Sequence, residues 1–378
     1  MKKVAILTQP LGKNYGGIIQ NFALQKALKN EGYFPVTVRR DNYEKFSLRL
    51  FLSSVKNKTY NQLLGKKRKE FTRKELDLVY SKMEDFIQKN INVTERIFST
   101  DGLRSHFHSQ KYSAVIVGSD QTWRPKYSPN ILNYYLDFIK SNNLITKISY
   151  ASSFGTDEWE YNDQEKNACT KLIKLFDAVS VREDSGINLC LEHFGMKAQL
   201  VLDPTLLLEK NEYLDVFKSS IRKRMGLFTY VLDRSSVKNN FIEQVSQKLR
   251  LPIFSNQPKK SINDVSNFHS LDEYMYPSVE DWLSSFHNAE FVITDSFHGT
   301  VFSIIFNKPF ISIVNSERGA SRFLSLLKLF SLEDRLVSSI DLFDFEKLYD
   351  PIDYEAVNTT LEDLRNDSKQ FLKFALTK

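Results

Sequence analysis

The stretch Glu290–Ile313, EFVITDSFHGTVFSIIFNKPFISI, decides the fold class because it contains a strand, a polar turn, a helix and a second strand. Phe291–Ile293 is a short apolar run rich in strand-forming residues, which is typical of a buried parallel strand. Thr300–Phe306 has apolar side chains at helical spacing, and Pro309 fits a loop before the next strand. The stretch therefore predicts a β-α-β unit.

A histidine follows the first strand of this unit. His298 lies near the start of the predicted helix, where backbone N–H groups point outward and the helix dipole favours an anion. In open α/β sheets ligands bind at the carboxyl ends of the strands, where this turn lies. Gly299 lets a ligand approach the backbone, and Ser296 can cap the helix. We expect an anion site that includes His298; a polar helix cap without a ligand is the alternative.

The length of 378 residues favours two domains over one compact core. Strands and helices alternate in both halves, which predicts an α/β fold of two similar domains with a cleft between them. We place the N-terminal domain at 1–205, with a helical insertion at about 43–110, and the C-terminal domain at 206–345. A helical segment at 346–378 can return to the N-terminal domain.

The net charge of +6 is unevenly spread, with the densest basic run at Lys66–Lys74, KKRKEFTRK. This run indicates either a solvated helix face or contact with an acidic polymer or the cytoplasmic membrane leaflet. The sequence contains no heptad zipper, zinc spacing or RNA-binding aromatic motif, so we do not expect nucleic acid as a partner.

Compartment follows from the cysteines and the apolar runs. Cys169 and Cys190 form no CxxC pair and no metal cluster, which predicts free core thiols and no metal site. The apolar part of the N-terminal MKKVAILTQPLG is too short for a signal peptide, and no run approaches the ~20 apolar residues of a membrane span. We expect a cytoplasmic protein, with the inner face of the membrane as an option.

Two loops of the first half carry polar groups at predicted strand ends. After the strand at Lys3–Thr8, a loop leads into a helix through Asn14, Tyr15, Gly16 and Gly17. This glycine-softened turn at a helix N-terminus is either an anion site or only a tight turn. It lacks the spacing of a dinucleotide fingerprint and the lysine of a P-loop, so no nucleotide cofactor is expected.

After the strand at Tyr112–Gly118, the second of these loops carries Ser119, Asp120, Gln121 and Trp123. Asp120 can accept a proton or orient a hydroxyl, or it can cap the next helix. Trp123 can stack on a sugar face, or it can belong to the core.

Arginines follow two further strands. Arg182 comes directly after Ala178–Val181 and suits a carboxylate or phosphate, unless it pairs with Asp184 or Asp203. In the second half, Arg318 and Arg322 lie in and just after the loop that follows the strand ending at Val314. These groups converge with His298 only if the strand ends of the two halves face one another.

The chain resembles the polysaccharide pyruvyl transferase family in a series of motifs spread over about residues 3–336. They are NYGGIIQNFALQ (Asn14–Gln25), GSDQTW (Gly118–Trp123), SVREDSG (Ser180–Gly186), VLDPTLLL (Val201–Leu208), DSFHGTVFSIIFNKPFI (Asp295–Ile311) and ERGASR (Glu317–Arg322). One departure is Arg124, which follows GSDQTW where the family leads us to expect a small polar residue.

The resemblance implies two Rossmann-like domains arranged as in GT-B glycosyltransferases. It also implies transfer of pyruvate from phosphoenolpyruvate onto sugar hydroxyls of a polysaccharide or its lipid-linked precursor, as a cyclic ketal. The N-terminal domain would then hold the acceptor and the C-terminal domain the donor anion. Phosphoenolpyruvate is a donor substrate, so no cofactor is implied.

On this reading His298 is the acid/base, Asp120 orients or deprotonates an acceptor hydroxyl, and Arg182 with Arg318 or Arg322 holds the donor's anionic groups. The substrate-binding set is Asn14, Tyr15, Gly16, Gly17, Ser119, Gln121, Trp123, Ser296, Gly299, Arg318 and Arg322. The alternatives are a GT-B nucleotide-sugar glycosyltransferase, which needs a nucleobase pocket, and a non-catalytic glycan-binding protein, which would release no phosphate.

Overall fold

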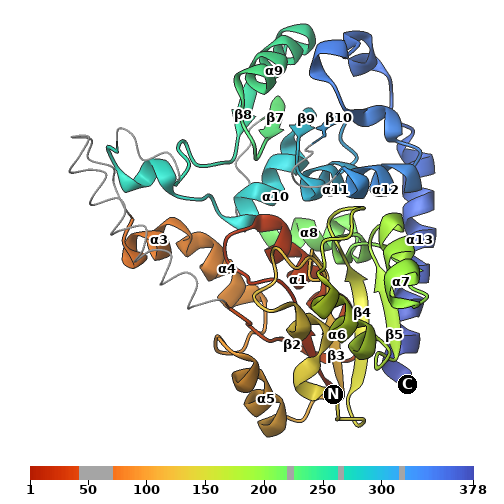
Figure 1. Cartoon of the computed structure of the whole chain (residues 1–378). Coiled ribbons are helices and arrows are strands. Elements are labelled where there is room, and N and C mark those ends of the chain that lie inside the picture. Colours follow the sequence, from red (N-terminus) through yellow and green to blue (C-terminus); the bar gives the residue numbers. More distant parts are fainter. Residues whose placement is uncertain (42–70, 219–224, 263–267, 315–319) are drawn as a thin grey trace.

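The computed structural model describes residues 1–41, 71–218, 225–262, 268–314 and 320–378. Two parallel sheets organise it, and Figure 1 shows one above the other. The first sheet has the strand order β2-β1-β3-β4-β5-β6 and the second has the order β11-β10-β9-β7-β8. The predicted α/β fold with two parallel sheets is confirmed.

The strands are short and largely buried. The first sheet contains β1 (Lys3–Leu7), β2 (Phe34–Thr37), β3 (Ala114–Val117), β4 (Thr146–Ser152), β5 (Ala178–Val181) and β6 (Gln199–Leu200). The second contains β7 (Leu227–Tyr230), β8 (Ile253–Ser255), β9 (Phe291–Thr294), β10 (Phe310–Ile313) and β11 (Leu336–Val337). All residues of β3, β9 and β10 are buried, as expected of parallel strands with both faces covered.

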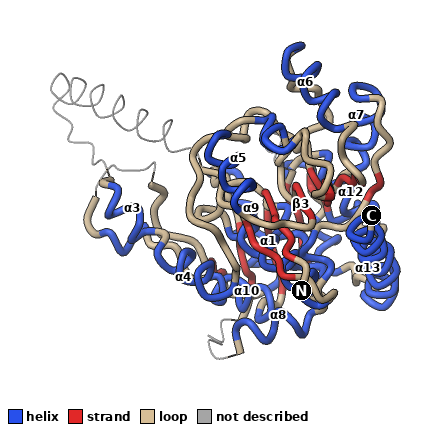
Figure 2. Tube along the Cα trace, turned by 90° about the horizontal axis from the view of Figure 1, so that it is seen from below, coloured by secondary structure: helices blue, strands red, loops and turns tan. Residues whose placement is uncertain are grey.

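Helices surround the strands, as the turned view in Figure 2 shows. Those up to residue 218 are α1 (Tyr15–Asn30), α3 (Arg73–Val79), α4 (Ser81–Asn90), α5 (Thr100–Ser109), α6 (Asp163–Ile173), α7 (Asp184–Phe194) and α8 (Lys210–Phe217). Those that follow are α9 (Ser236–Leu249), α10 (Val279–Asn288), α11 (Phe297–Ile305), α12 (Ser321–Leu329) and α13 (Tyr354–Thr377). Short 3₁₀ helices include η1 (Ile131–Tyr135) and η3 (Pro204–Leu207).

The predicted β-α-β unit at Glu290–Ile313 is confirmed as β9, α11 and β10. The helix begins at Phe297, three residues before the apolar spacing indicated, because the Ser296 hydroxyl caps it by accepting from the Gly299 N–H. His298 is therefore the second residue of α11 rather than part of a loop.

One hydrophobic cluster extends through both halves. It includes Ile18 and Ile116 from the first half and Val292 and Phe302 from the second. Where the halves meet, the Tyr15 ring stacks on Trp282 with centroids 5.4 Å apart, and the Tyr15 hydroxyl donates to the Pro277 carbonyl. This continuous packing holds the two sheets in a defined relation.

Helix α13 runs past both halves (Figure 1). Ser368 Oγ accepts from the Leu202 N–H, and Arg365 Nε donates to the Leu206 carbonyl. Phe371 lies against Tyr150 of β4, with ring centroids 6.2 Å apart. The last helix therefore packs on the first sheet and on the segment that connects the halves.

The predicted basic run falls partly outside the described residues. Of the basic run Lys66–Lys74, only the part from residue 71 is described, and there Thr72 caps α3.

Cys169 and Cys190 are free and buried, and burial raises the pKa of Cys190 to about 12. Within the described ranges, no helix has both the length and the apolar character to cross a bilayer.

Candidate functional site

A cavity of about 280 Å³ lies between the two halves, close to the ~300 Å³ lower end of typical small-molecule sites. Its wall in the first half comes from the loops after β1 and β3 and from the start of α1: Gln9, Pro10, Leu11, Asn14, Gly17, Ile18, Asp120, Gln121 and Tyr127. Its wall in the second half comes from the strand ends of β7 and β9 and from α11 and α12: Leu232, Asp295, Ser296, Phe297, His298, Arg322 and Phe323. The strand ends of both halves thus face the same cavity.

Three helices begin at this cavity. Helix α1 starts after Asn14, whose Oδ1 accepts from the Gly16 N–H at 3.0 Å, and α11 starts after Ser296. Helix α12 starts at Ser321, beside Arg322. None of the three has an acidic residue in its own first turn to offset its positive end. The arrangement favours an anionic ligand.

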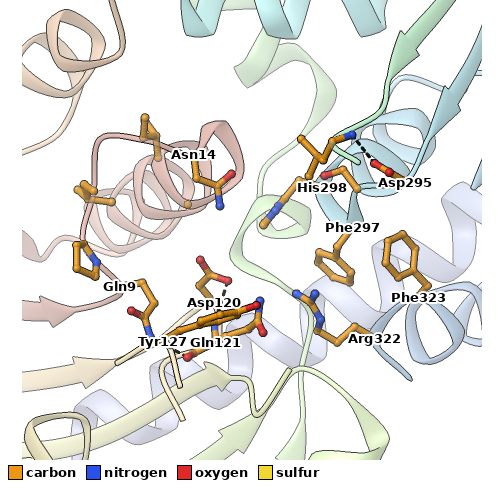
Figure 3. A pocket seen from close by; sticks show the side chains of 16 residues that line it. Gln9, Asn14, Asp120, Gln121, Tyr127, Asp295, Phe297, His298, Arg322 and Phe323 are labelled. Carbon is orange, nitrogen blue, oxygen red and sulfur yellow. Dashed lines mark hydrogen bonds between the residues drawn. The ribbon is translucent and has the colours of Figure 1, made fainter. Parts of the chain in front are cut away.

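His298 lies where the two halves meet. Its side chain is 8% exposed and points into the cavity between Asn14 and Phe297 (Figure 3). Nε2 is 3.7 Å from Oδ2 of Asp203 and makes no hydrogen bond within the described residues. The ring also lies against Gly16, where a β-carbon would lie 2.1 Å from Nδ1. Only glycine at position 16 admits the ring in this place.

Asp203 is the buried carboxylate behind His298. Oδ2 accepts from Arg182 Nη1 at 2.7 Å and from Gln20 Nε2, and Oδ1 accepts from the N–H and hydroxyl of Thr205. Burial alone would raise the pKa of Asp203, but His298, Arg182 and Thr205 together lower it below its usual value. Asp203 is therefore anionic at neutral pH.

Sequence reasoning gave Asp203 no place in the site. Asp203 belongs to the VLDPTLLL motif and caps η3, but its contact with His298 joins residues about a hundred positions apart.

Arg182 is surrounded by three carboxylates. Besides Asp203, Asp120 Oδ1 lies 3.9 Å from Nη2 and Glu183 Oε2 lies 3.9 Å from Nε. Burial lowers the pKa of Arg182, but Asp203, Glu183 and Asp120 raise it above the usual value. Of the two pairings left open for Arg182, the one with Asp203 is therefore observed. The guanidinium lies behind the cavity rather than in its wall.

Phe297 lies close to two arginines. The guanidinium of Arg182 lies 4.5 Å from the ring centroid and that of Arg322 lies 5.7 Å from it. Burial and the charge of Arg182 lower the pKa of Arg322 to about 10. Arg322 lines the cavity and is still protonated at neutral pH. A bound anion would stabilise this buried cation, which is the electrostatic basis of an anion site here.

Asp120 lies on the opposite wall. Its Oδ1 accepts from the Gln121 N–H at 2.9 Å, and its backbone has a φ of 69°. The structure shows no helix directly after it, since the next helical segment is η1 at Ile131–Tyr135, so the helix-cap alternative is wrong. In Figure 3 Asp120 and Arg322 reach toward the space into which His298 points.

Trp123 does not line the cavity. It is fully buried, stacks on Tyr135 with centroids 5.2 Å apart, and donates from Nε1 to the Tyr134 carbonyl. The expectation that its ring meets a sugar is corrected: Trp123 is a core residue, the other reading of the sequence. The aromatic side chain that the first half contributes to the described cavity wall is Tyr127, which is 43% exposed. Sequence reasoning missed it because a lone tyrosine in a loop gives no signal.

Other predicted site residues support the site from behind. Tyr15 is buried against Trp282, and Ser119 Oγ accepts from Gln20 Nε2. Gly299 packs against Thr294, where a β-carbon would come 2.1 Å from Oγ1. None of these three residues lines the cavity. Arg318 lies outside the described residues.

Gln121 lines the cavity and is held by the unexpected Arg124. Arg124 Nη1 donates to Gln121 Oε1 at 3.1 Å, and its Nε and Nη2 form a bidentate pair with Glu160. The departure from the expected small residue therefore adds a buried support for Gln121. Among the described residues, no group of three or more His, Cys, Asp and Glu could hold a metal ion.

A family model described as polysaccharide pyruvyl transferase matches residues 14–317, which include the described cavity wall from Asn14 to Ser296–His298. The chain belongs to the polysaccharide pyruvyl transferase family. Membership makes this pyruvyl transferase family protein an enzyme, a transferase of polysaccharide biosynthesis. No curated protein matches the chain.

Solved structures show the fold of this pyruvyl transferase family member. The UDP-GlcNAc 2-epimerase of Methanocaldococcus jannaschii, in complex with UDP-GlcNAc and UDP, is 12% identical with a TM-score of 0.50, covering 99% of each chain. UGT89C1 of Arabidopsis thaliana, complexed with UDP-L-rhamnose, is 9% identical with a TM-score of 0.52, covering 99% of this chain and 98% of its own. UGT71G1 of Medicago truncatula, complexed with UDP-glucose, is 11% identical with a TM-score of 0.50, covering 100% of this chain and 99% of its own. The predicted GT-B-like architecture is confirmed.

Proposed function

We propose that this enzyme transfers pyruvate from phosphoenolpyruvate onto two hydroxyls of a sugar in a polysaccharide or its lipid-linked precursor, forming a cyclic ketal. Family membership supports a pyruvate donor and a polysaccharide acceptor. The observation that carries the proposal is the single cavity that His298, Arg322 and Asp120 share.

The donor fits the charge of the cavity. Phosphoenolpyruvate carries a carboxylate and a phosphate, which call for cations and backbone N–H donors. The cavity offers Arg322 and the starts of α1, α11 and α12. Arg182, behind the cavity, is balanced by carboxylates; it pairs with Asp203 and lies 3.9 Å from Asp120, and so holds these two side chains in place.

The reaction needs one acid and two bases over its course. The methylene carbon of the donor gains a proton, the bond between C2 and the phosphate oxygen breaks, and two bonds form between C2 and sugar oxygens. Of the two hydroxyl protons, one balances the proton gained by the methylene and the other leaves with phosphate. Imidazole suits this exchange because histidine changes charge near neutral pH.

His298 is the acid/base in this proposal. Asp120 orients an acceptor hydroxyl or accepts its proton, because Oδ1 is engaged with Gln121 while Oδ2 has no hydrogen bond within the described residues. Asp295 is a poor candidate, since both its oxygens accept from Leu232, Asp233 and Lys238. Developing positive character at C2 is compatible with the nearby carboxylates.

The test is release of inorganic phosphate from phosphoenolpyruvate in the presence of a panel of sugar and lipid-linked glycan acceptors. With donor labelled by ¹³C at C2, the product should show a ketal carbon by NMR. His298→Gln is the matched inactive control. No phosphate release with any acceptor, together with a thermal shift on UDP but none on phosphoenolpyruvate, would favour a nucleotide-sugar enzyme instead.

A further inference from the structure

The first half, the second half and the connection between them meet at one oxygen atom. Oδ2 of Asp203 accepts from Arg182 Nη1 and from Gln20 Nε2, both in the first half, and lies 3.7 Å from His298 Nε2 of α11. Asp203 itself lies between the last strand of the first sheet and η3. Its side chain is 1% exposed.

The orientation of this carboxylate is fixed by its own turn. Oδ1 accepts from Thr205 N at 3.0 Å and from Thr205 Oγ1 at 2.7 Å, and Pro204 restricts the backbone between them. With Oδ1 engaged in this way, Oδ2 is the oxygen directed at the three donors. The position of Oδ2 is therefore fixed by the hydrogen bonds that Oδ1 accepts from Thr205.

Asp203 is the anionic neighbour of Nε2 in the His298 ring. Nε2 is buried and makes no hydrogen bond within the described residues, and Asp203 is its ion-pair neighbour. Catalytic hydrogen bonds are often long before substrate binds and shorten in the complex. An anion that holds the proton of Nε2 leaves Nδ1 as the nitrogen that exchanges a proton with substrate, by the general logic of a carboxylate orienting an imidazole.

We propose that Asp203 is a positioning residue that orients the His298 ring and fixes its proton on Nε2, leaving Nδ1 to act on the substrate. The inference rests on the proposed function for its kinetic consequences, but its structural content does not. Because Asp203 also holds Arg182, it ties the acid/base of one half to the arginine of the other.

The first measurement needs no substrate. Histidine labelled with ¹⁵N reports which ring nitrogen carries the proton, and the His298 signals are those lost in His298→Gln. Above the pH range in which histidine titrates, the wild type should show a single form with the proton on Nε2. Asp203→Asn should mix the two tautomers, since a carboxamide offers Nε2 no anion. Unchanged His298 signals in Asp203→Asn would overturn the proposal.

Two further variants keep this measurement decisive. Glu183→Gln alters another buried carboxylate beside Arg182, one that forms no hydrogen bond or ion pair with His298 in the described part of the chain, and it should leave the tautomer unchanged. If Asp203→Asn does not fold, Thr205→Val removes the hydroxyl that holds Oδ1 while keeping the N–H and the side-chain volume. Thr205→Val should then shift the tautomer ratio in the same direction by less, and no shift would overturn the proposal.

The second measurement is a double-mutant cycle on kcat. Asp203→Asn should lower kcat by about 10²- to 10⁴-fold while the KM for phosphoenolpyruvate changes little. In a His298→Gln background it should cost nothing further, because Asp203 acts through His298. Losses that add would mean that Asp203 affects the reaction by a route other than His298, and would overturn the proposal. If the wild type releases no phosphate with any acceptor, the proposed function fails, and the tautomer result still decides the role of Asp203.

Discussion

Gly16 and His298 are in contact across the boundary between the two halves: a β-carbon at Gly16 would lie 2.1 Å from Nδ1 of His298. One residue belongs to the first turn of α1 and the other to the first turn of α11. The starts of two helices from different halves can approach each other closely because Gly16 has no side chain.

Gly16→Ala should displace the His298 ring, because real β-carbons do not approach within 3.0 Å of such an atom. We expect kcat for phosphate release to fall by about 10- to 100-fold, since a misplacement of ~1 Å can cost 10²-fold. Gly17→Ala is the comparison: its β-carbon would meet Asp120 Oδ2 at an ordinary 3.6 Å, so its loss should be smaller. Equal losses of kcat in the two variants would show that the effect of Gly16→Ala does not come from displacing His298.

His298→Gln should lower kcat by at least about 10²-fold if the imidazole is the acid/base. The fold should survive, because the side chain lies at the cavity rather than inside either sheet's core. Phosphate release measures the first effect, and far-UV circular dichroism with thermal melting measures the second. Wild-type turnover in this variant would remove His298 from the mechanism.

Arg322→Met should weaken phosphoenolpyruvate binding by about 10-fold or more, as measured by calorimetry, because hydrogen bonds to charged groups contribute about 1.5–3 kcal/mol. The control is Arg335→Lys, since Arg335 is a buried arginine of the same half that binds main-chain carbonyls away from the cavity. Undiminished binding by Arg322→Met would exclude Arg322 from the anion site.

The same site should show a pH dependence. The pKa of Arg322 is lowered to about 10, so its charge is complete near neutral pH and is lost as the pH rises through about 10. The buried cation therefore costs folding stability below that pH, and a bound anion offsets the cost. Phosphoenolpyruvate affinity should hold from pH 7 to about 9 and fall above it, with this fall absent in Arg322→Met. A flat affinity through pH 10.5 in the wild type would contradict the assignment.

Asp295→Ala should destabilise the second half by about 3–5 kcal/mol, because it leaves Lys238 and two backbone N–H groups without their buried acceptor. Guanidinium denaturation measures this loss. Lys238→Met should cost less, since the carboxylate keeps Leu232 and Asp233 as donors. A change in kcat without a change in stability would instead indicate a direct role in the reaction.

Trp123→Leu should lower stability by about 3 kcal/mol or more, as expected for truncating a fully buried ring, and leave the KM for the acceptor nearly unchanged. Tyr127→Ala should do the opposite, because Tyr127 is partly exposed and lines the cavity. Acceptor KM values for the two variants provide the measurement. A raised acceptor KM in Trp123→Leu at unchanged stability would restore the sugar-stacking reading.

The repeating pattern of the chain was enough to predict the architecture. Apolar runs such as Phe291–Ile293, each followed by a polar turn and a helical pattern, indicate parallel strands wherever they occur, because the signal is local. The same locality explains why Asn14, Ser296 and His298 could be placed at helix starts: capping depends on residues two or three positions away. Strand-end placement then made Asp120 and Arg322 candidates for one cavity.

Other roles depended on contacts that a sequence does not encode locally. Trp123 follows a strand as a binding residue could, yet its ring turns into the core against Tyr135. Arg182 occupies a strand end, yet three carboxylates surround it.

The sequence by itself determined the two α/β halves and the polar groups at their strand ends, because periodicity, capping and turn chemistry act over a few residues. Only the tertiary structure decided that Gly16 admits His298, that Asp203 lies behind it, and that Phe297 contacts two arginines. Except for the contact of Phe297 with Arg322, these relations join residues about a hundred or more positions apart. Such contacts arise from the packing of one half against the other, and this packing cannot be predicted from any single stretch of the chain.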